Sequence, residues 1–375
     1  MTVNKFHIVC ILLSAALLLP GCKKDLSVSD GGISLSKVPV RFTSPSVESK
    51  APLNISMGPT YNTAEDFIAY AAYSPSPFDP SVPSSYESYW TGGQRCTYNS
   101  SYGSTLGAWA PEGQFFFPLA GYLNFRAYSP ADGAAPTSFS WADGFTWNDF
   151  TVPPAGSQYD LLYSDLVKDC QQSDYTIDDE GGYDDDSDLT GNVYNGIDLS
   201  FHHALSLVEV QAVSALGSYS TIKYYVQKVK LHNVYNKGDF ASSTGNWTDI
   251  DTEHPEDYTL LDLSGEVNPA DQWKKLPGSD QYPVSIHPDK TLLLLPQTLD
   301  RDGDPLTYAS DAYLEVVYKC STDDTPQTTQ VSLPDVWERG KKYTYKLVFS
   351  AYIEFVAEIS AWDEDITYGN HVIVQ

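Results

Sequence analysis

Apolar and polar residues alternate along several short stretches of the chain, which is the pattern of a β-strand with one packed face. Leu123 falls on one face of such a stretch and Asn124 on the other. The same period of two recurs in residues 313–320 and in residues 342–349, where Thr344 lies on the polar face. These runs predict an all-β protein built from antiparallel β-sandwiches, in which each strand has one solvated face.

Two apolar runs depart from this alternation. Residues 291–297 contain an unbroken series of leucines, as in a strand that is covered on both faces or that changes phase at a bulge. In residues 197–210 the apolar positions change phase. We expect a bulge near Leu207.

A carboxylate-rich segment, residues 170–192, divides the chain. Like charges at this density repel one another and extend a chain, as in a linker. We place a domain boundary there, which gives an N-terminal β-sandwich domain at residues 33–185 and a C-terminal one at residues 186–375. The length suits two domains, and the 42% of hydrophobic residues can supply a core for each.

The N-terminus has the features of an export signal. Lys5 is followed by an apolar run at residues 8–19, which is shorter than the ~20 residues of a membrane-spanning helix. A glycine then precedes Cys22, as in the lipobox of bacterial lipoproteins. We expect residues 1–21 to be a lipoprotein signal peptide, Cys22 to be lipidated and residues 22–32 to form a tether, because several acyl chains hold a protein firmly on a membrane.

The net charge argues against nucleic acid as a partner, and the cysteine spacing argues against a zinc site. The formal net charge is −27, so nucleic acid is not an expected partner, because phosphate binding needs clustered Lys and Arg. Cys96, Cys170 and Cys320 remain in the mature chain and lack the spacing of a zinc site. They allow at most one disulfide, and buried single thiols fit equally well.

The motifs of common enzyme classes are missing from the sequence. There is no GxSxG, HExxH, P-loop or GxGxxG pattern, so we expect no enzyme and no cofactor. His202 and His203 are the strongest catalytic candidates. Adjacent residues of a strand point to opposite faces, so we expect His203 in the core, with a hydrogen bond, and His202 facing outward.

Calcium is the alternative interpretation of the acidic stretches, because clustered carboxylates are its ligands. The two candidates are DDEGGYDDDSD at residues 178–188 and DRDGD at residues 300–304. Neither has the spacing of an EF-hand loop. We therefore expect no dedicated metal site.

Tryptophans offer a second functional hypothesis. Trp90 and Trp109 could stack on sugar rings, whereas Trp147, Trp337 and Trp362 lie in strand-like contexts and are expected in the core. The alternative function is therefore that of a monomeric surface lipoprotein that binds glycans on aromatic platforms.

Seven segments follow one another in an order that is typical of one known family. They are YLNFRAYSP (122–130), QYDLLYSD (158–165), LSFHHALSLVEV (199–210), KVKLHNV (228–234), LLLLPQ (292–297), VWERGKKYTYKLVF (336–349) and EISAW (358–362). With the lipoprotein start, they resemble the fimbrillin-like (type V pilin) family of Bacteroidetes surface lipoproteins. The resemblance covers residues 22–375.

This resemblance implies two transthyretin-like β-sandwich domains and a non-enzymatic subunit or tip adhesin of a fimbrium (pilus). It also implies a lipid anchor in the outer membrane, a location on the cell surface, and no catalytic residue, metal or cofactor. The implied partners are other fimbrillin subunits, a processing protease, and a receptor on a host or bacterial surface. In such a family the protease removes an N-terminal strand, and a strand of another subunit fills the groove that is left.

The replaceable strand expected here is the one that contains Val38, Val40 and Phe42 on a single face. Pro39 lacks an N–H group, which suits an edge strand. A Ser- and Pro-rich loop follows, and its Lys50 is the candidate cleavage site. The family is usually cut after arginine, and the nearest arginine, Arg41, lies inside the expected strand.

The candidate donor strand is HVIVQ at residues 371–375, with Val372 and Val374 on one face. Its shortness leaves both a stalk subunit, which needs a donor strand, and a tip subunit, which needs only an acceptor groove, as options.

Overall fold

The structure is a computed structural model that describes residues 38–42, 46–47, 65–99, 108–175, 196–287, 291–302, 308, 310–333, 336–350, 353–361 and 371–372. All of these residues belong to one compact unit spanning residues 38–375. Their regular structure is β-strand, apart from two 3₁₀ turns at Pro83–Ser85 and Gln172–Tyr175, so the expected all-β class is confirmed. No helix of this described part is long and apolar enough to cross a bilayer.

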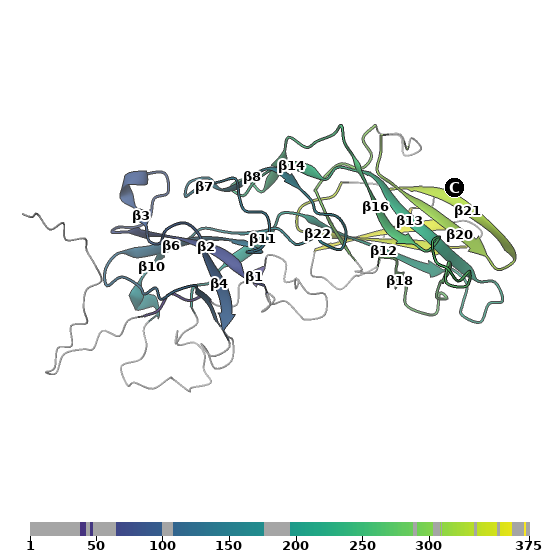
Figure 1. Cartoon of the computed structure of the whole chain (residues 1–375), viewed down its shortest axis with the longest axis horizontal. Helices are drawn as coiled ribbons and strands as arrows, with labels where there is room; N and C mark the ends of the chain where they lie inside the picture. The colour runs from purple at the N-terminus through teal and green to yellow at the C-terminus, as the bar shows by residue number, and fades with distance from the viewer. Residues whose placement is uncertain are drawn as a thin grey trace, which may run out of the picture. The chain divides into compact units, whose positions relative to one another are not determined.

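The first part of the chain forms a large, mostly antiparallel sheet, here called sheet 1 (Figure 1). Its described strands are β1 (Ser46–Val47), β2 (Phe67–Ser74), β3 (Glu87–Ser88), β4 (Gln94–Asn99), β5 (Ala108–Pro111), β6 (Tyr122–Ser129), β9 (Leu162–Ser164), β10 (Val167–Cys170) and β11 (Ser200–His203). The strand order is β1-β11-β9-β6-β2-β4-β5, with β10 paired to β6 and β3 paired to β2. Period-two sequences account for these strands: in β2, Phe67, Ala69 and Ala71 are buried.

A small sheet, sheet 2, joins strands from both sides of the expected boundary at residues 185/186. It contains β7 (Ser138–Ser140), β8 (Gly144–Thr151), β14 (Lys237–Ala241) and β15 (Asn246–Thr248). β14 lies antiparallel to β8, and the buried Trp147 of β8 contacts the buried Phe240 of β14 with ring centroids 6.0 Å apart. The division into domains at residues 185/186 stays a prediction.

The remaining strands form two sheets that share one core. Sheet 3 contains β12 (Ser206–Ser214), β18 (Val284–Ser285), β19 (Leu292–Leu294), β22 (Lys341–Phe349), β23 (Ile353–Ala361) and β24 (His371–Val372). Sheet 4 contains β13 (Tyr224–Val234), β16 (Glu256–Asp262), β17 (Lys274–Lys275), β20 (Tyr313–Cys320) and β21 (Asp323–Ser332). Buried Val210 and Leu347 from sheet 3 pack in one cluster with Val226 and Leu314 from sheet 4, which is the arrangement of a β-sandwich.

The expectation of a solvated face is wrong at two central strands. Asn124 of β6 is fully buried, and its amide donates to Ser74 Oγ (3.1 Å) and accepts from the backbone N–H of Asp169 (2.8 Å). Thr344 of β22 is buried as well, with 2% exposed. Neighbouring segments satisfy the hydrogen bonds of Asn124, and the period of two does not reveal those segments. The hydroxyl of Thr344 has no hydrogen-bond partner among the described residues, so its burial has no such explanation.

The two irregular apolar runs have different explanations. The phase change expected as a bulge near Leu207 is instead a break between β11 and β12, at which the chain passes from sheet 1 to sheet 3. In the leucine run, Leu292 and Leu294 belong to the core between sheets 3 and 4, whereas Leu295 packs with the aromatic residues around Trp147. The apolar run is unbroken because its leucines pack into two different hydrophobic cores.

Candidate functional site

The segment Val38–Phe42, here called the closing segment, lies in the core of sheet 1. Val38, Val40 and Phe42 are buried, with exposed fractions of 4%, 2% and 0%, while the residues between them are half-buried. Burial of each apolar side chain contributes ~1.5–3 kcal/mol. The alternation in the sequence therefore corresponds to an alternation of inward and outward side chains.

On one side the closing segment pairs with β5 and with the residues that follow it. The backbone N–H of Val40 donates to Phe115 O (2.9 Å), and the N–H of Phe117 donates to Val38 O (2.8 Å). Phe42 and Trp109 exchange two bonds, of 2.9 and 3.1 Å. This side of the segment is thus antiparallel to its neighbour.

On the other side the same segment meets the chain that leads into β11. The N–H of Ile197 donates to Arg41 O (2.8 Å), and Phe42 forms a parallel bridge with Ile197. The parallel pairing continues from β1, where Ser46 lies opposite Ser200. The closing segment therefore lies between β5, which is one end of the strand order, and the chain that leads into β11, which is the neighbour of β1 at the other end. In this position it closes sheet 1 on itself.

The expectation of an edge strand is therefore wrong, because Phe42 has bridge partners on both sides. Pro39 is tolerated for a local reason. Pro39 and Phe116 face each other as a non-hydrogen-bonded pair, and the bonds to this neighbour come from Val38 and Val40 on either side. The missing N–H group of Pro39 therefore removes no bond to that neighbour.

The Phe42 ring anchors the segment in an aromatic cluster. It makes edge-to-face contacts with Phe67 and Phe125, each with ring centroids 5.4 Å apart. Trp109, fully buried, extends the cluster through Phe67. Such pairs contribute ~0.5–1.5 kcal/mol beyond area burial, so Phe42 is expected to be the most strongly bound side chain of the segment.

A perturbed carboxyl group lies beside this cluster. The indole N–H of Trp109 donates to the backbone oxygen of Glu65 (3.3 Å). Burial raises the pKa of the Glu65 side chain, and the nearby carboxylates of Asp160, Asp66 and Asp132 raise it further. Negative charge at Glu65 is therefore unfavourable in the folded protein.

The described residues contain only part of the expected processing and donor sites. Cys22, Lys50 and Val374 lie outside them. Arg41 is half-buried within the closing segment, where its carbonyl oxygen accepts the bond from Ile197. A protease needs an extended, accessible backbone, so cleavage after Arg41 would require this part of the sheet to open first.

At the other end of the chain, β24 pairs with β23. Val372 lies opposite Phe355, and His371 lies opposite Val356, in antiparallel register. β24 is the last strand in the order of sheet 3 and has one described neighbour. The described part of the candidate donor segment thus lies at the end of the described strand order of sheet 3.

The two adjacent histidines have separate carboxylate partners. His203 is 1% exposed, and its Nδ1 lies 2.6 Å from Oδ2 of the buried Asp160, which confirms the prediction of a hydrogen-bonded core histidine. His202 Nε2 lies 2.9 Å from Oδ2 of the largely exposed Asp165. The imidazoles are not brought together at one site.

The interpretation of Trp90 and Trp109 as sugar-stacking platforms is wrong. They are 4% and 0% exposed, and the indole N–H of Trp90 donates to Ala69 O (3.2 Å). Trp147 and Trp337 are buried, as expected, and Trp362 lies outside the described residues. The three cysteines described, Cys96, Cys170 and Cys320, form no disulfide.

Two tyrosines that the sequence did not single out are almost fully exposed. Tyr219 is 97% and Tyr282 is 94% exposed, on two loops joined by a bond from the backbone N–H of Ser218 to Asp280 Oδ1 (2.6 Å). Tyr282 borders a hollow of about 440 Å³.

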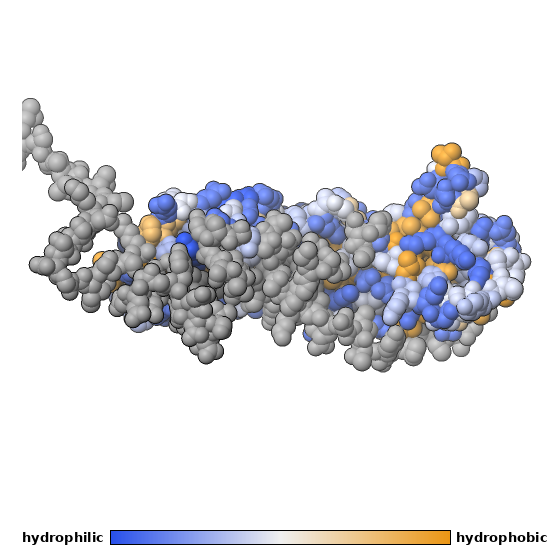
Figure 2. All heavy atoms as spheres, turned by 90° about the horizontal axis from the view of Figure 1, so that it is seen from below, coloured by the Kyte–Doolittle hydropathy of each residue, from blue (hydrophilic) through white to orange (hydrophobic). Residues whose placement is uncertain are grey.

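Figure 2 shows one face of the molecule, on which hydrophobic colour is confined to small areas among hydrophilic ones.

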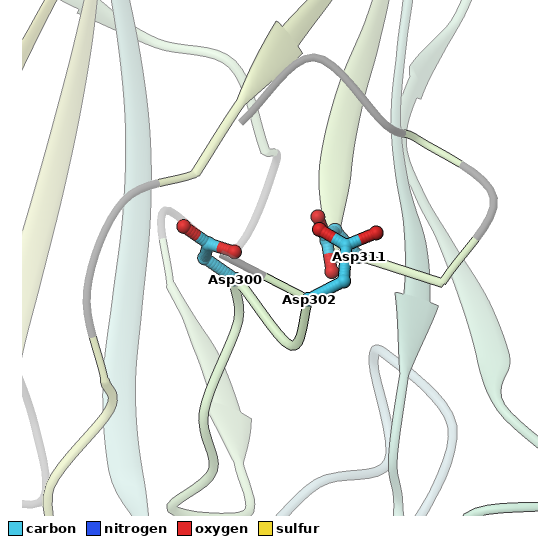
Figure 3. Close-up of side chains that lie close together, drawn as sticks. All are labelled: Asp300, Asp302 and Asp311. Atoms are coloured by element: carbon cyan, nitrogen blue, oxygen red, sulfur yellow. The ribbon is translucent and has the colours of Figure 1, made fainter. Parts of the chain in front are cut away.

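Three acidic side chains at one end of sheet 4 approach one another. Asp300, Asp302 and Asp311 each offer a carboxylate oxygen, and these oxygens all lie within 4.8 Å of one another (Figure 3). Two of the three belong to the DRDGD stretch, for which the sequence predicted no metal.

Similarity to known proteins is consistent across sequence and structure. A sequence model of the fimbrillin-like family matches residues 84–362, and no curated protein matches the chain. A fimbrial protein from Bacteroides vulgatus ATCC 8482 has a similar structure, with a TM-score of 0.54, 17% identity, and coverage of 86% of this chain and 99% of that one. A proposed cell adhesion protein from Bacteroides uniformis ATCC 8492 gives a TM-score of 0.50 and 14% identity, over 87% of this chain and 98% of that one.

At these identities the two crystal structures support the fold. The family match spans most of the chain and includes strands of all four sheets, from β3 in sheet 1 to β23 in sheet 3. The expected resemblance is thus confirmed, and the chain belongs to the fimbrillin-like family.

Proposed function

We propose that this protein is a non-enzymatic subunit or tip adhesin of a surface fimbrium, which assembles by exchange of its closing segment for a strand of another subunit. The observation that carries this proposal is the two-sided pairing of Val38–Phe42, which joins β5 to the approach to β11. The chain belongs to a fimbrial family, in which a replaceable strand would serve to join subunits.

Removal of the closing segment would open sheet 1 at one place. Its departure would leave the space of three buried apolar side chains and would unpair the backbone groups of Trp109, Phe115, Phe117 and Ile197. Buried backbone groups without partners are strongly unfavourable, and unpaired strand edges recruit other strands. The resulting groove would favour β-augmentation by a strand with alternating apolar residues.

The C-terminal segment is the proposed donor. β24 pairs with β23 at two described positions and lies at the end of the strand order of sheet 3, so its release would break described pairing with one strand only. Val372 and Val374 would supply the apolar side chains that replace those of the closing segment.

Processing and export complete the proposal. We propose signal-peptide removal, lipidation of Cys22, and an outer-membrane anchor that holds the subunit until a protease cuts at Lys50. Lys50 lies between β1 and β2, so cleavage there would cut no described strand and would separate Val38–Phe42, together with β1, from the remaining fold. Arg41 is a poorer site, because it is paired within sheet 1.

The test is limited digestion of the full-length protein with a trypsin-like protease, followed by electrophoresis without boiling. Cleavage near Lys50 is expected to produce SDS-resistant ladders. Lys50→Gln should remain monomeric, and Lys228→Gln, which changes a lysine of β13 far from the loop in sequence, should form ladders like the unchanged protein. Efficient cleavage without ladders would contradict strand exchange.

A second candidate function, glycan binding, is favoured by the exposed pair of tyrosines. Aromatic faces in water are suited to stacking on sugar rings, and Tyr219 and Tyr282 occupy two joined loops. Titration with oligosaccharides, followed by intrinsic fluorescence, tests this function. The double variant Tyr219→Ala/Tyr282→Ala should lose any response, and a response that persists in this variant would exclude these loops.

A further inference from the structure

We propose that Asp300, Asp302 and Asp311 bind a calcium ion. Asp300 and Asp302 lie in the loop that follows β19, and Asp311 lies two residues before β20. The loop and the strand are held side by side, because the N–H of Ala312 donates to Leu299 O (3.1 Å). Figure 3 shows the carboxylates of Asp302 and Asp311 together and that of Asp300 beside them.

The burial of Asp311 is the observation that points to a ligand. This residue is only 5% exposed, and its Oδ1 accepts the backbone N–H of Arg301 (2.7 Å). Its Oδ2 is buried and has no hydrogen-bond partner among the described residues. A buried carboxylate oxygen without a partner is unfavourable unless a cation neutralises it.

The neighbouring guanidinium group does not fill this role. Arg301 Nη2 donates to Asn233 O (2.8 Å) and to Gln297 Oε1 (3.1 Å), and its Cζ lies 3.7 Å from the centre of the Tyr235 ring. Arg301 attracts Asp311 through its charge. Its Nη1 donates to Ser310 O, so both terminal nitrogens are directed to neutral oxygens, and its Nε makes no hydrogen bond to Asp311. Oδ2 of Asp311 therefore remains open to an ion.

The chemistry of the three ligands favours calcium. Each ligand is a carboxylate oxygen, and the cluster contains no histidine or cysteine, which zinc prefers. Calcium accepts six to eight oxygens at ~2.3–2.6 Å in irregular geometry and completes its shell with water, whereas magnesium demands a near-octahedral arrangement. Sites of this kind in extracellular proteins bind calcium with Kd on the order of 10⁻⁴–10⁻³ M.

The consequence for the fold is a calcium-dependent link between a loop of sheet 3 and a central strand of sheet 4. Asp300 and Asp302 follow β19, which pairs with β12, while Asp311 leads into β20, which pairs with β13 and β21. A bound ion would hold these two segments together at one end of the sandwich. Calcium should therefore raise the thermal midpoint of unfolding.

Calorimetric titration of the EDTA-treated full-length protein with CaCl₂ is the direct test. We expect a single site with Kd on the order of 10⁻⁴–10⁻³ M, and at least tenfold weaker binding of MgCl₂. Asp311→Asn should weaken calcium binding at least tenfold. Glu253→Gln, which changes an exposed acid outside the cluster, should leave it unchanged.

Two further results distinguish an ion site from a structural carboxylate. In EDTA, Asp311→Asn should melt above the unchanged protein, because the uncompensated charge is gone, and CaCl₂ should not shift its melting. Asp302→Asn, at an exposed position, provides a second variant that should fold and lose binding. Absence of calcium binding up to ~10 mM, above the usual range of such sites, or equal binding by all variants, would overturn the proposal.

Discussion

The closing segment and β24, near the two ends of the described structure, differ in how they are held. The closing segment is hydrogen-bonded on both sides and contributes three buried side chains to the core of sheet 1. β24 has one described neighbour and pairs with it at two positions. Loss of the first would open a groove lined by the apolar partners of three buried side chains, whereas loss of the second would remove, among the described contacts, the pairing with β23.

Under the proposed strand exchange, this contrast would give the two ends complementary parts in assembly. A strand that is essential to a core leaves behind a site that binds its replacement tightly. A strand that has few contacts within its own chain is available to another subunit. Under the proposed exchange, the N-terminal end therefore defines the acceptor and the C-terminal end the donor.

The largest effect is expected from truncation of the anchor of the closing segment. Phe42→Ala should lower the free energy of unfolding by ~3–5 kcal/mol, because a buried aromatic ring is replaced by a cavity. Urea denaturation of the uncleaved protein measures this change. Ile359→Ala on β23, where the side chain is 54% exposed, is the control and should change stability by less than ~0.5 kcal/mol.

A moderate effect is expected from deletion of residues 371–375. The free energy of unfolding should fall by about 1 kcal/mol or less, since the described contribution of this segment is the pairing of β24 with β23 at two positions. The cleaved protein should no longer form SDS-resistant ladders. A loss of stability as large as that of Phe42→Ala would show that β24 is part of the core and would remove the contrast between the two ends.

A smaller, pH-dependent effect is expected at Glu65. Because the folded pKa of Glu65 is raised above 4.5, the folded protein loses stability as the pH rises through the window between 4.5 and that raised value. Glu65→Gln should therefore raise the urea midpoint at pH 7, and the gain should shrink below pH 4.5. Asp174→Asn, at an exposed position, is the control. A gain that is the same at both pH values would indicate a cause other than charge.

The sequence was informative where local pattern decides the structure. Alternation predicted β6, β20 and β22, and it also predicted that Val38 and Phe42 share one face. The alternation did not predict burial where a side chain is covered by segments that are distant in the sequence. The exposed faces expected at Asn124 and Thr344 are covered by the fold, and Trp90 gave no local sign of burial.

The candidate site shows the same limit. The three inward residues of the closing segment could be identified from their spacing, but its second neighbour, the chain at Ile197, is 155 positions away from Phe42 in sequence. The acidic cluster likewise needs Asp311, which lies outside the DRDGD stretch. Both features depend on tertiary contacts that no local pattern encodes.

The most direct test of the central claim is the N-terminal sequence of subunits isolated from SDS-resistant polymers on the native cell surface. Strand exchange predicts that these subunits begin after Phe42, at Ala51 if Lys50 is the cleavage site. Polymers whose subunits begin at Cys22 and retain Val38–Phe42 would contradict the account.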